Sequence, residues 1–235
     1  MLRQIEERLL YEDNHLMVVN KEAGEIVQGD KTGDRAMPDE IKDFIARRDS
    51  KPGNVFLGVT HRLDRPTSGA VVFAKTSKAL SRMNELFRKG EVDKTYWAIT
   101  EKAPPKKEDT LKNWLFRDRK KNRSFCWNEP GEGRQEARLR YKLLASSDRY
   151  HLVEVELLTG RHHQIRCQLS ALGCPIKGDL KYGAKRSNRG GGISLHARRI
   201  AFVHPVKKEE LNLTAPVPPE DALWRHFEES CGEGV

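Results

Sequence analysis

The run HRLDRPTSG places one carboxylate, Asp64, between Arg62 and Arg65. In an extended segment, residues i and i+2 point to the same side, so Arg62 and Asp64 can face one cavity together. Pro66 and Gly69 follow and end any strand, because proline lacks a backbone donor. A carboxylate at such a break can act on a ligand as a nucleophile or a base. From the spacing alone, a structural ion pair or an aspartate that caps the turn explains Asp64 at least as well.

A second arginine, Arg166, lies in the segment TGRHHQIRCQLSALG, which predicts a helix over residues 160–173. Free backbone N–H groups at Thr159 and Gly160, just before this helix, can bind an anion. Beside the apolar Leu169, Arg166 would lie at the core edge and need a carboxylate, because an unpaired buried charge is costly. Asp64 is the candidate partner. The alternative is that Arg166 extends its charged end to solvent.

The strand KTYWAIT carries an aromatic residue beside a cation, because Lys94 and Tyr96 point to the same side. This combination suits base stacking together with a phosphate contact. Taken alone, a tyrosine in an ordinary sheet core is the simpler explanation. Ser68 with His61 as nucleophile and base lacks the GxSxG context. The histidines and cysteines match neither CxxC nor HExxH spacing, so we predict no metal site.

The composition favours a polyanionic partner. The chain has 235 residues, of which 37% are hydrophobic and 33% charged, with a formal net charge of +9. Nucleic acid is the commonest polyanion, although many basic proteins bind none. No apolar run approaches the length of a membrane helix, and the N-terminus lacks the apolar core of a signal peptide. The four cysteines show no disulfide-rich spacing, so we expect reduced thiols in a cytoplasmic protein.

Apolar periodicity predicts hairpins interspersed with a few helices. We therefore expect an α+β fold with a mixed, mostly antiparallel sheet and flanking helices and loops. No linker divides the chain, so residues 1–235 are predicted to form a single domain. It carries a basic excursion at about 104–135 and a mobile glycine-rich loop at about 184–192. Helices are expected within residues 37–48, 76–90, 160–173 and 218–229, and strands within 8–22, 70–75, 92–100, 136–159, 193–205 and 209–216.

Together these segments resemble the RluA-type pseudouridine synthases. HRLDRPTSGAVVFAKT is similar to the family signature HRLDxxTSGxxxxAK, and TGRHHQIRCQLSALGCPIKGDLKYG to TGRTHQIRxHxxxxGxPIxGDxxYG. DKTYWAIT, LHARRIAFVHP and VVNKEAGEIV are similar to KxYxAxV, LHAxxLxFxHP and VxKPxGxxV. The similarity runs in order from residue 9 to about 220. His162, Gln168 and Glu22 depart from the usual Thr, His and Pro, which affects local packing and substrate fit.

The resemblance implies a stand-alone pseudouridine-synthase-like core without the S4 domain of many relatives. It implies isomerisation of specific uridines in ribosomal or transfer RNA, without cofactor or metal. The family's catalytic aspartate corresponds to Asp64, as nucleophile at the sugar or as base on an intermediate. Arg166 corresponds to its partner, Tyr96 to the stacking residue and Arg62 to the residue that displaces the flipped base.

The expected partner is RNA, with no membrane association and no obligate protein partner, so we expect a monomer. The basic segments at 117–123 and 181–199 would contact phosphates; the predicted RNA-contacting residues are Lys94, Arg117, Arg119, Lys120, Lys121, Arg123, Lys185 and Arg186. Two other functions make different demands on these residues. An RNA-binding module without catalysis would need a changed nucleophile, whereas Asp64 is present. A nuclease using His61 and Asp64 would need a metal cluster or a second catalytic histidine, and neither is evident.

Overall fold

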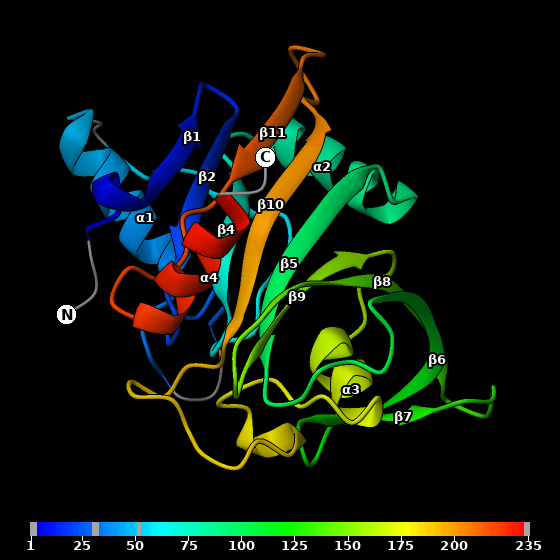
Figure 1. Cartoon of the computed structure of the whole chain (residues 1–235). Coiled ribbons are helices and arrows are strands. Elements are labelled where there is room, and N and C mark those ends of the chain that lie inside the picture. Colours follow the sequence, from blue (N-terminus) through cyan, green and yellow to red (C-terminus); the bar gives the residue numbers. More distant parts are fainter. Residues whose placement is uncertain (1–3, 30–32, 51–52, 233–235) are drawn as a thin grey trace. The chain divides into compact units, whose positions relative to one another are not determined.

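A computed structural model describes residues 4–29, 33–50 and 53–232 of the chain (Figure 1). The chain forms two compact units. The first comprises Met1–Val92 and Arg198–Pro216, and the second comprises Asp93–Ala197 and Val217–Val235. The prediction of a single domain stays a prediction.

The first unit contains a sheet with the strand order β1-β2-β4-β10, in which β11 pairs with β10 and β3 pairs with β4. These strands pair antiparallel to one another. The strands are β1 (Leu9–Glu12), β2 (Leu16–Lys21), β3 (Gly58–Val59), β4 (Ser68–Ala74), β10 (Leu195–Val203, which begins in the second unit) and β11 (Glu210–Thr214). The helices are η1 (Glu6–Arg8), α1 (Met37–Arg48) and α2 (Ser77–Lys89).

Local sequence signals explain where α2 begins and ends. The Thr76 side chain accepts a hydrogen bond from the Ala79 N–H at 3.1 Å, which caps the first turn. Gly90 ends the helix in the left-handed conformation at φ 75°, which glycine adopts without a steric penalty. Met83 points from α2 into a core shared with β2, β4 and β10. The helix predicted over residues 76–90 is therefore confirmed with both caps.

The second unit contains a sheet with the strand order β5-β9-β8-β6-β7, again with antiparallel pairings. Figure 1 shows α3 lying within the curve of β6, β7, β8 and β9. Apolar side chains of β6 and β8 pack against α3, and a second core forms between β5, β9 and α4. The elements are β5 (Val92–Thr100), β6 (Glu108–Asp118), β7 (Arg123–Trp127), β8 (Gln135–Ser146), β9 (His151–Leu157), α3 (Gln164–Ala171), η2 (Leu180–Tyr182) and α4 (Ala222–Gly232).

The α+β class with a mostly antiparallel sheet is confirmed. The basic excursion at about 104–135 is itself strand structure, since most of it forms the β6–β7 hairpin beside β8. Within the glycine-rich loop at 184–192, the Asn188 side chain accepts a hydrogen bond from Lys177 Nζ at 2.7 Å and donates one to Ser194 at 3.1 Å. Among the described residues, no helix is both long and apolar enough to cross a membrane.

Candidate active site

Asp64 begins a tight turn in the first unit. Its backbone oxygen accepts a hydrogen bond from the Thr67 N–H at 3.0 Å, which closes the turn around Arg65 and Pro66. The turn was predicted, but the strand before it ends early, because β3 covers only Gly58–Val59. The extended-chain alternation is nevertheless visible in the burial of the side chains. Arg62 is exposed and Asp64 is half-buried, whereas Leu63 between them is buried.

A buried lysine lies under this turn. Lys21, the last residue of β2, is 1% exposed, and its Nζ donates hydrogen bonds to three backbone oxygens of the turn. The distances are 3.3 Å to Asp64, 3.0 Å to Arg65 and 2.7 Å to Thr67. These bonds fix the backbone that carries Asp64. Sequence reasoning missed Lys21; the signal was a lysine that ends the apolar strand LMVVNK.

Burial lowers the pKa of Lys21 to about 7, because the desolvated ammonium is disfavoured. The negative charges of Glu25 and Asp64 oppose this shift, which also shows that Asp64 lies within electrostatic reach of the amine. Glu25 is fixed in turn by Arg8, whose Nη1 lies 2.6 Å from its carboxylate, with both side chains buried. Lys21, Glu25 and Arg8 therefore form a network of buried charges next to the Asp64 turn.

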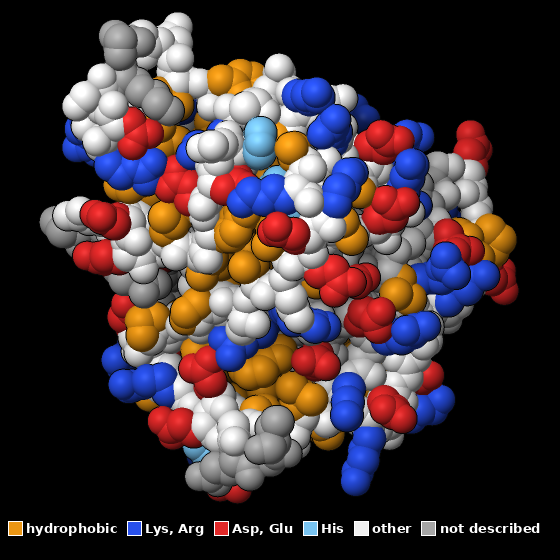
Figure 2. Space-filling view, turned by 90° about the horizontal axis from the view of Figure 1, so that it is seen from above, with side chains coloured by type: hydrophobic (Ala, Val, Ile, Leu, Met, Phe, Trp, Pro, Cys, Tyr) orange, Lys and Arg blue, Asp and Glu red, His pale blue; other side chains and the backbone are white. Residues whose placement is uncertain are grey.

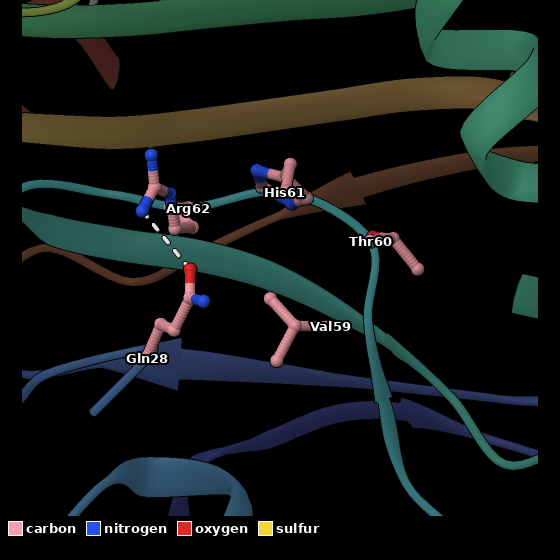
Figure 3. Close-up of a pocket in the computed structure, with 5 residues that line it drawn as sticks. All are labelled: Gln28, Val59, Thr60, His61 and Arg62. Carbon is pink, nitrogen blue, oxygen red and sulfur yellow. Dashed lines mark hydrogen bonds between the residues drawn. The ribbon is translucent and has the colours of Figure 1, made fainter.

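Arg62 lies at the rim of an open pocket of about 310 Å³ that is lined by Gln28, Val59, Thr60, His61 and Arg62 (Figure 3). This volume is at the lower end of the range for small-ligand sites. The Arg62 Nη1 donates to the side-chain oxygen of Gln28 at 3.0 Å, as the dashed line in Figure 3 shows. The pocket therefore combines an exposed guanidinium with one polar side chain that orients it.

His61 has a structural task. Its Nε2 accepts a hydrogen bond from the Val72 N–H of β4 at 3.1 Å, and its ring lies 4.7 Å from that of Phe87. The nitrogen that would act as a base is thus directed at the backbone of the sheet. This argues against the nuclease that used His61 and Asp64.

Arg166 is buried in the second unit, 5% exposed on α3. Its Nε and Nη2 donate to the two carboxylate oxygens of Asp179 at 2.7 and 2.9 Å, a bidentate pair. The Tyr182 ring lies 5.1 Å from the centre of the guanidinium. The alternative in which Arg166 extends to solvent is wrong. Sequence reasoning missed Asp179 as a partner, although the segment TGRHHQIRCQLSALGCPIKGDLKYG contains Arg166 and both of the residues that contact it. The pairing of Arg166 with Asp64 stays a prediction.

The start of α3 differs from the prediction. The helix begins at Gln164, because His163 adopts the left-handed conformation at φ 53°. The side-chain oxygen of Gln164 accepts the Arg161 N–H at 3.0 Å and the Thr159 hydroxyl at 2.7 Å. Residues 159–160 therefore belong to a loop folded onto Gln164. They do not stand at the helix N-terminus, and the Thr159 N–H donates to the Arg138 backbone oxygen at 3.2 Å. Anion binding at residues 159–160 stays a prediction.

Tyr182 connects this loop to β7. Its hydroxyl accepts the Ser124 N–H at 2.8 Å and lies 3.0 Å from Nδ1 of His163. Burial lowers the pKa of His163 to about 2, and the nearby Arg166 charge adds to the effect. His163 is therefore neutral, and its role is the hydrogen bond to the Tyr182 hydroxyl. The Asp179 carboxylate and the Tyr182 ring together hold the Arg166 guanidinium in one orientation.

Tyr96 and Lys94 lie on β5, with Tyr96 7% exposed and paired in register with Val155 of β9. Burial lowers the pKa of the half-buried Lys94. Its Nζ is 3.9 Å from the position that a Cβ would occupy at Gly160. The structure thus brings Lys94 next to the TGR loop before α3. The stacking role of Tyr96 stays a prediction.

The remaining predicted RNA-contacting residues lie on the surface of the second unit. All are exposed except the half-buried Arg123; they are Arg117, Arg119, Lys120, Lys121, Arg123, Lys185 and Arg186. Figure 2 shows one face of the molecule, on which Lys and Arg side chains are interspersed with Asp and Glu. Over the described ranges, no group of three or more His, Cys, Asp or Glu side chains could hold a metal ion. That a reaction without metal or cofactor occurs here stays a prediction.

Comparisons with known proteins place the chain in a family. The model of the RNA pseudouridylate synthase family matches residues 15–171. The protein YhcT of Bacillus subtilis, named an uncharacterized RNA pseudouridine synthase, is 36% identical over 217 residues, which cover 90% of this chain and 69% of that protein. Ribosomal large subunit pseudouridine synthase C of Rickettsia bellii is 33% identical over 214 residues, which cover 90% of this chain and 69% of that protein.

A solved structure gives the same result. Human RNA pseudouridylate synthase domain containing 4 superposes with a TM-score of 0.78 at 26% sequence identity, covering 97% of this chain and 94% of that one. The chain therefore belongs to the RluA-type pseudouridine synthases, which are isomerases that act on uridine in RNA.

Proposed function

We propose that this chain converts specific uridines of ribosomal or transfer RNA into pseudouridine, with Asp64 as the catalytic carboxylate. The single observation that carries the proposal is the anchoring of the Asp64 turn. Lys21 donates hydrogen bonds to three backbone oxygens of this turn, at Asp64, Arg65 and Thr67. A rigid backbone with a half-buried acid at its start is the arrangement that a nucleophile or base requires.

The reaction is an isomerisation that balances without a further reactant. The bond from N1 of the base to C1′ of the sugar breaks, the base turns, and its C5 bonds to C1′. The proton on C5 leaves, and N1 takes up a proton. Asp64 either attacks C1′ or removes a proton from an intermediate, and both roles need the ionised carboxylate.

Three other side chains are assigned supporting roles. Arg166 pairs with Asp64, as its correspondence to the family's arginine implies. The bidentate pair with Asp179 fixes how the Arg166 guanidinium is turned. Tyr96 stacks on the uridine, and Arg62 occupies the place of the flipped base. Unstacking a base costs a few kcal/mol, and stacking on an aromatic ring returns about 1–3 kcal/mol.

The names of the relatives support the kind of RNA that we propose, and the cysteines support the cellular compartment. Relatives from several bacteria bear the name ribosomal large subunit pseudouridine synthase C, which favours ribosomal over transfer RNA. The four cysteines are free, as in proteins of a reducing compartment such as the cytoplasm. Action as a monomer is part of the same proposal.

Total RNA from a strain that lacks the gene provides the test. The RNA is incubated with the wild-type protein, and pseudouridine is mapped by chemical modification and reverse-transcription stops. New sites should appear, and Asp64→Ala should remove them while the protein melts as the wild type does. The matched control is Asp109→Ala, which removes an exposed carboxylate in the second unit and should keep all sites. Conversion by Asp64→Ala, or RNA shortened without new sites, would overturn the proposal.

A further inference from the structure

The hairpin of β6 and β7 carries four aromatic side chains on one face. Trp114 lies opposite Trp127, and Phe116 lies opposite Phe125. The rings of Phe116 and Trp127 meet edge-on with centroids 6.4 Å apart, and those of Phe125 and Trp127 are 6.1 Å apart. These four residues are called the aromatic platform below. The backbone pairing of two strands does not itself require four aromatic side chains on one face.

The platform faces away from α3. Side chains alternate between the two faces of a strand, so Leu115 and Cys126 point opposite to their aromatic neighbours. Leu115 is 4% exposed and belongs to the cluster that contains Cys167 of α3. Phe116, the next residue, is 41% exposed. The hairpin therefore uses one face for the core and presents its aromatic face outward.

Cations lie over the platform rings. The distances from the charged group to the ring centroid lie within the range of cation–π contacts. They are 5.3 Å for Lys112 over Trp114, 4.4 Å for Arg134 over Trp127, and 5.9 and 5.4 Å for Lys121 and Arg123 over Phe125. The hairpin turn between the strands adds two further exposed cations, Arg119 and Lys120. The face thus combines ring surfaces with positive charge, of which the Lys112 ammonium is paired with Glu136 at 3.2 Å.

We propose that the aromatic platform binds unpaired bases of the RNA substrate by stacking, while the surrounding cations contact the adjoining phosphates. This inference rests on the proposed function and extends it to a subsite separate from the reacting uridine. Every base has a ring face, so aromatic side chains beside cations bind single-stranded RNA with little sequence preference. Arginine guanidinium planes, such as that of Arg134 on Trp127, stack on bases as well.

The chemistry of the face selects single-stranded over double-stranded RNA. Bases in a duplex are already stacked on their neighbours and offer no ring face to a protein. A face that served only to support the hairpin would need neither exposed rings nor cations directed at them. The platform therefore reads the unpaired segments of a folded RNA, and the charge complements the phosphates of that same segment.

The binding test uses the full chain and two labelled probes, a single-stranded oligouridylate and a blunt RNA duplex. Fluorescence anisotropy should show tighter binding of the single strand. The variant Trp114→Leu/Phe116→Leu keeps apolar bulk but loses the rings, and it should weaken single-strand binding about tenfold. The matched control Trp114→Tyr/Phe116→Tyr retains two rings and should bind within about twofold of the wild type. An equal loss in both variants, or in neither, overturns the proposal.

A second measurement, of pseudouridine formation, separates this inference from the proposed function. At saturating total RNA, the Leu variant should still form pseudouridine, because the platform supplies affinity and not chemistry. Asp64→Ala should bind oligouridylate as the wild type does. If no protein forms pseudouridine but the Leu variant alone loses affinity, the platform stands and the proposed function fails. If the Leu variant binds normally but changes the oligomeric state, the face is a protein interface and the platform is overturned.

Discussion

Two buried cations support the two main sequence motifs, and they do so in different ways. Lys21 in the first unit donates to backbone oxygens of the Asp64 turn, whereas Arg166 in the second unit is held by the carboxylate of Asp179. The lysine fixes where a backbone lies, and the aspartate fixes how a side chain is turned. A lysine can also lose its proton near neutral pH, whereas arginine stays charged. The stability that the two anchors contribute should therefore depend differently on pH.

The largest effect is expected where the carboxylate anchor is broken. Arg166→Met leaves Asp179, 1% exposed, as a buried charge without its bidentate partner. We expect a loss of about 3–5 kcal/mol in the free energy of unfolding, measured by urea denaturation at pH 7. The double variant Arg166→Met/Asp179→Leu should regain most of it, since apolar groups replace the buried pair. A single variant as stable as the wild type would show that this pair does not anchor α3.

The backbone anchor should reveal itself through pH. The pKa of Lys21 is lowered from 10.5 to about 7 in the folded chain. Between these two pKa values, the unfolded chain binds the Lys21 proton more often than the folded chain does. The contribution of Lys21 to the free energy of unfolding therefore increases as pH rises from about 7, and is lost as pH falls back to about 7. Relative to Lys21→Met, the wild type should gain about 2 kcal/mol of unfolding free energy from pH 7 to pH 9. A difference that is constant over this range would contradict the lowered pKa.

The smallest effect on stability is expected at the pocket rim. Gln28→Ala removes the hydrogen bond that orients the exposed Arg62, which contributes about 0–1 kcal/mol at an exposed site. The melting temperature should stay unchanged, while the rate of pseudouridine formation should fall several-fold if Arg62 enters the RNA. The control Gln135→Ala removes an exposed glutamine elsewhere. Equal rates of pseudouridine formation for both variants would contradict a role for the orientation of Arg62 in the reaction.

The sequence predicted the features whose cause is local. Helix α2 has its cap and its terminal glycine within its own residues, and the Asp64 turn follows from Pro66. The start of α3 was missed because His163 adopts a left-handed conformation that its residue type does not require. Its ring nitrogen bonds Tyr182, a residue 19 positions further on.

Anchors that join distant residues were missed for a related reason. Burial of Arg166 was foreseen from the apolar residues beside it, but its partner Asp179 comes from a later turn-rich link. Lys21 and the Asp64 turn are more than 40 positions apart, and the end of a strand gives no sign of what lies beneath it. The platform on β6 and β7 was hidden because the segment was read only by its charge.

The most direct test of the central role of Asp64 follows the hydrogen that must leave C5. RNA transcribed with uridine tritiated at C5 is incubated with the wild type, Asp64→Ala and Asp109→Ala, and tritium released to water is counted. The wild type and Asp109→Ala should release tritium at equal rates. Asp64→Ala should release none while binding the RNA equally well. Release by Asp64→Ala at the wild-type rate would contradict the assignment of Asp64 as the catalytic carboxylate.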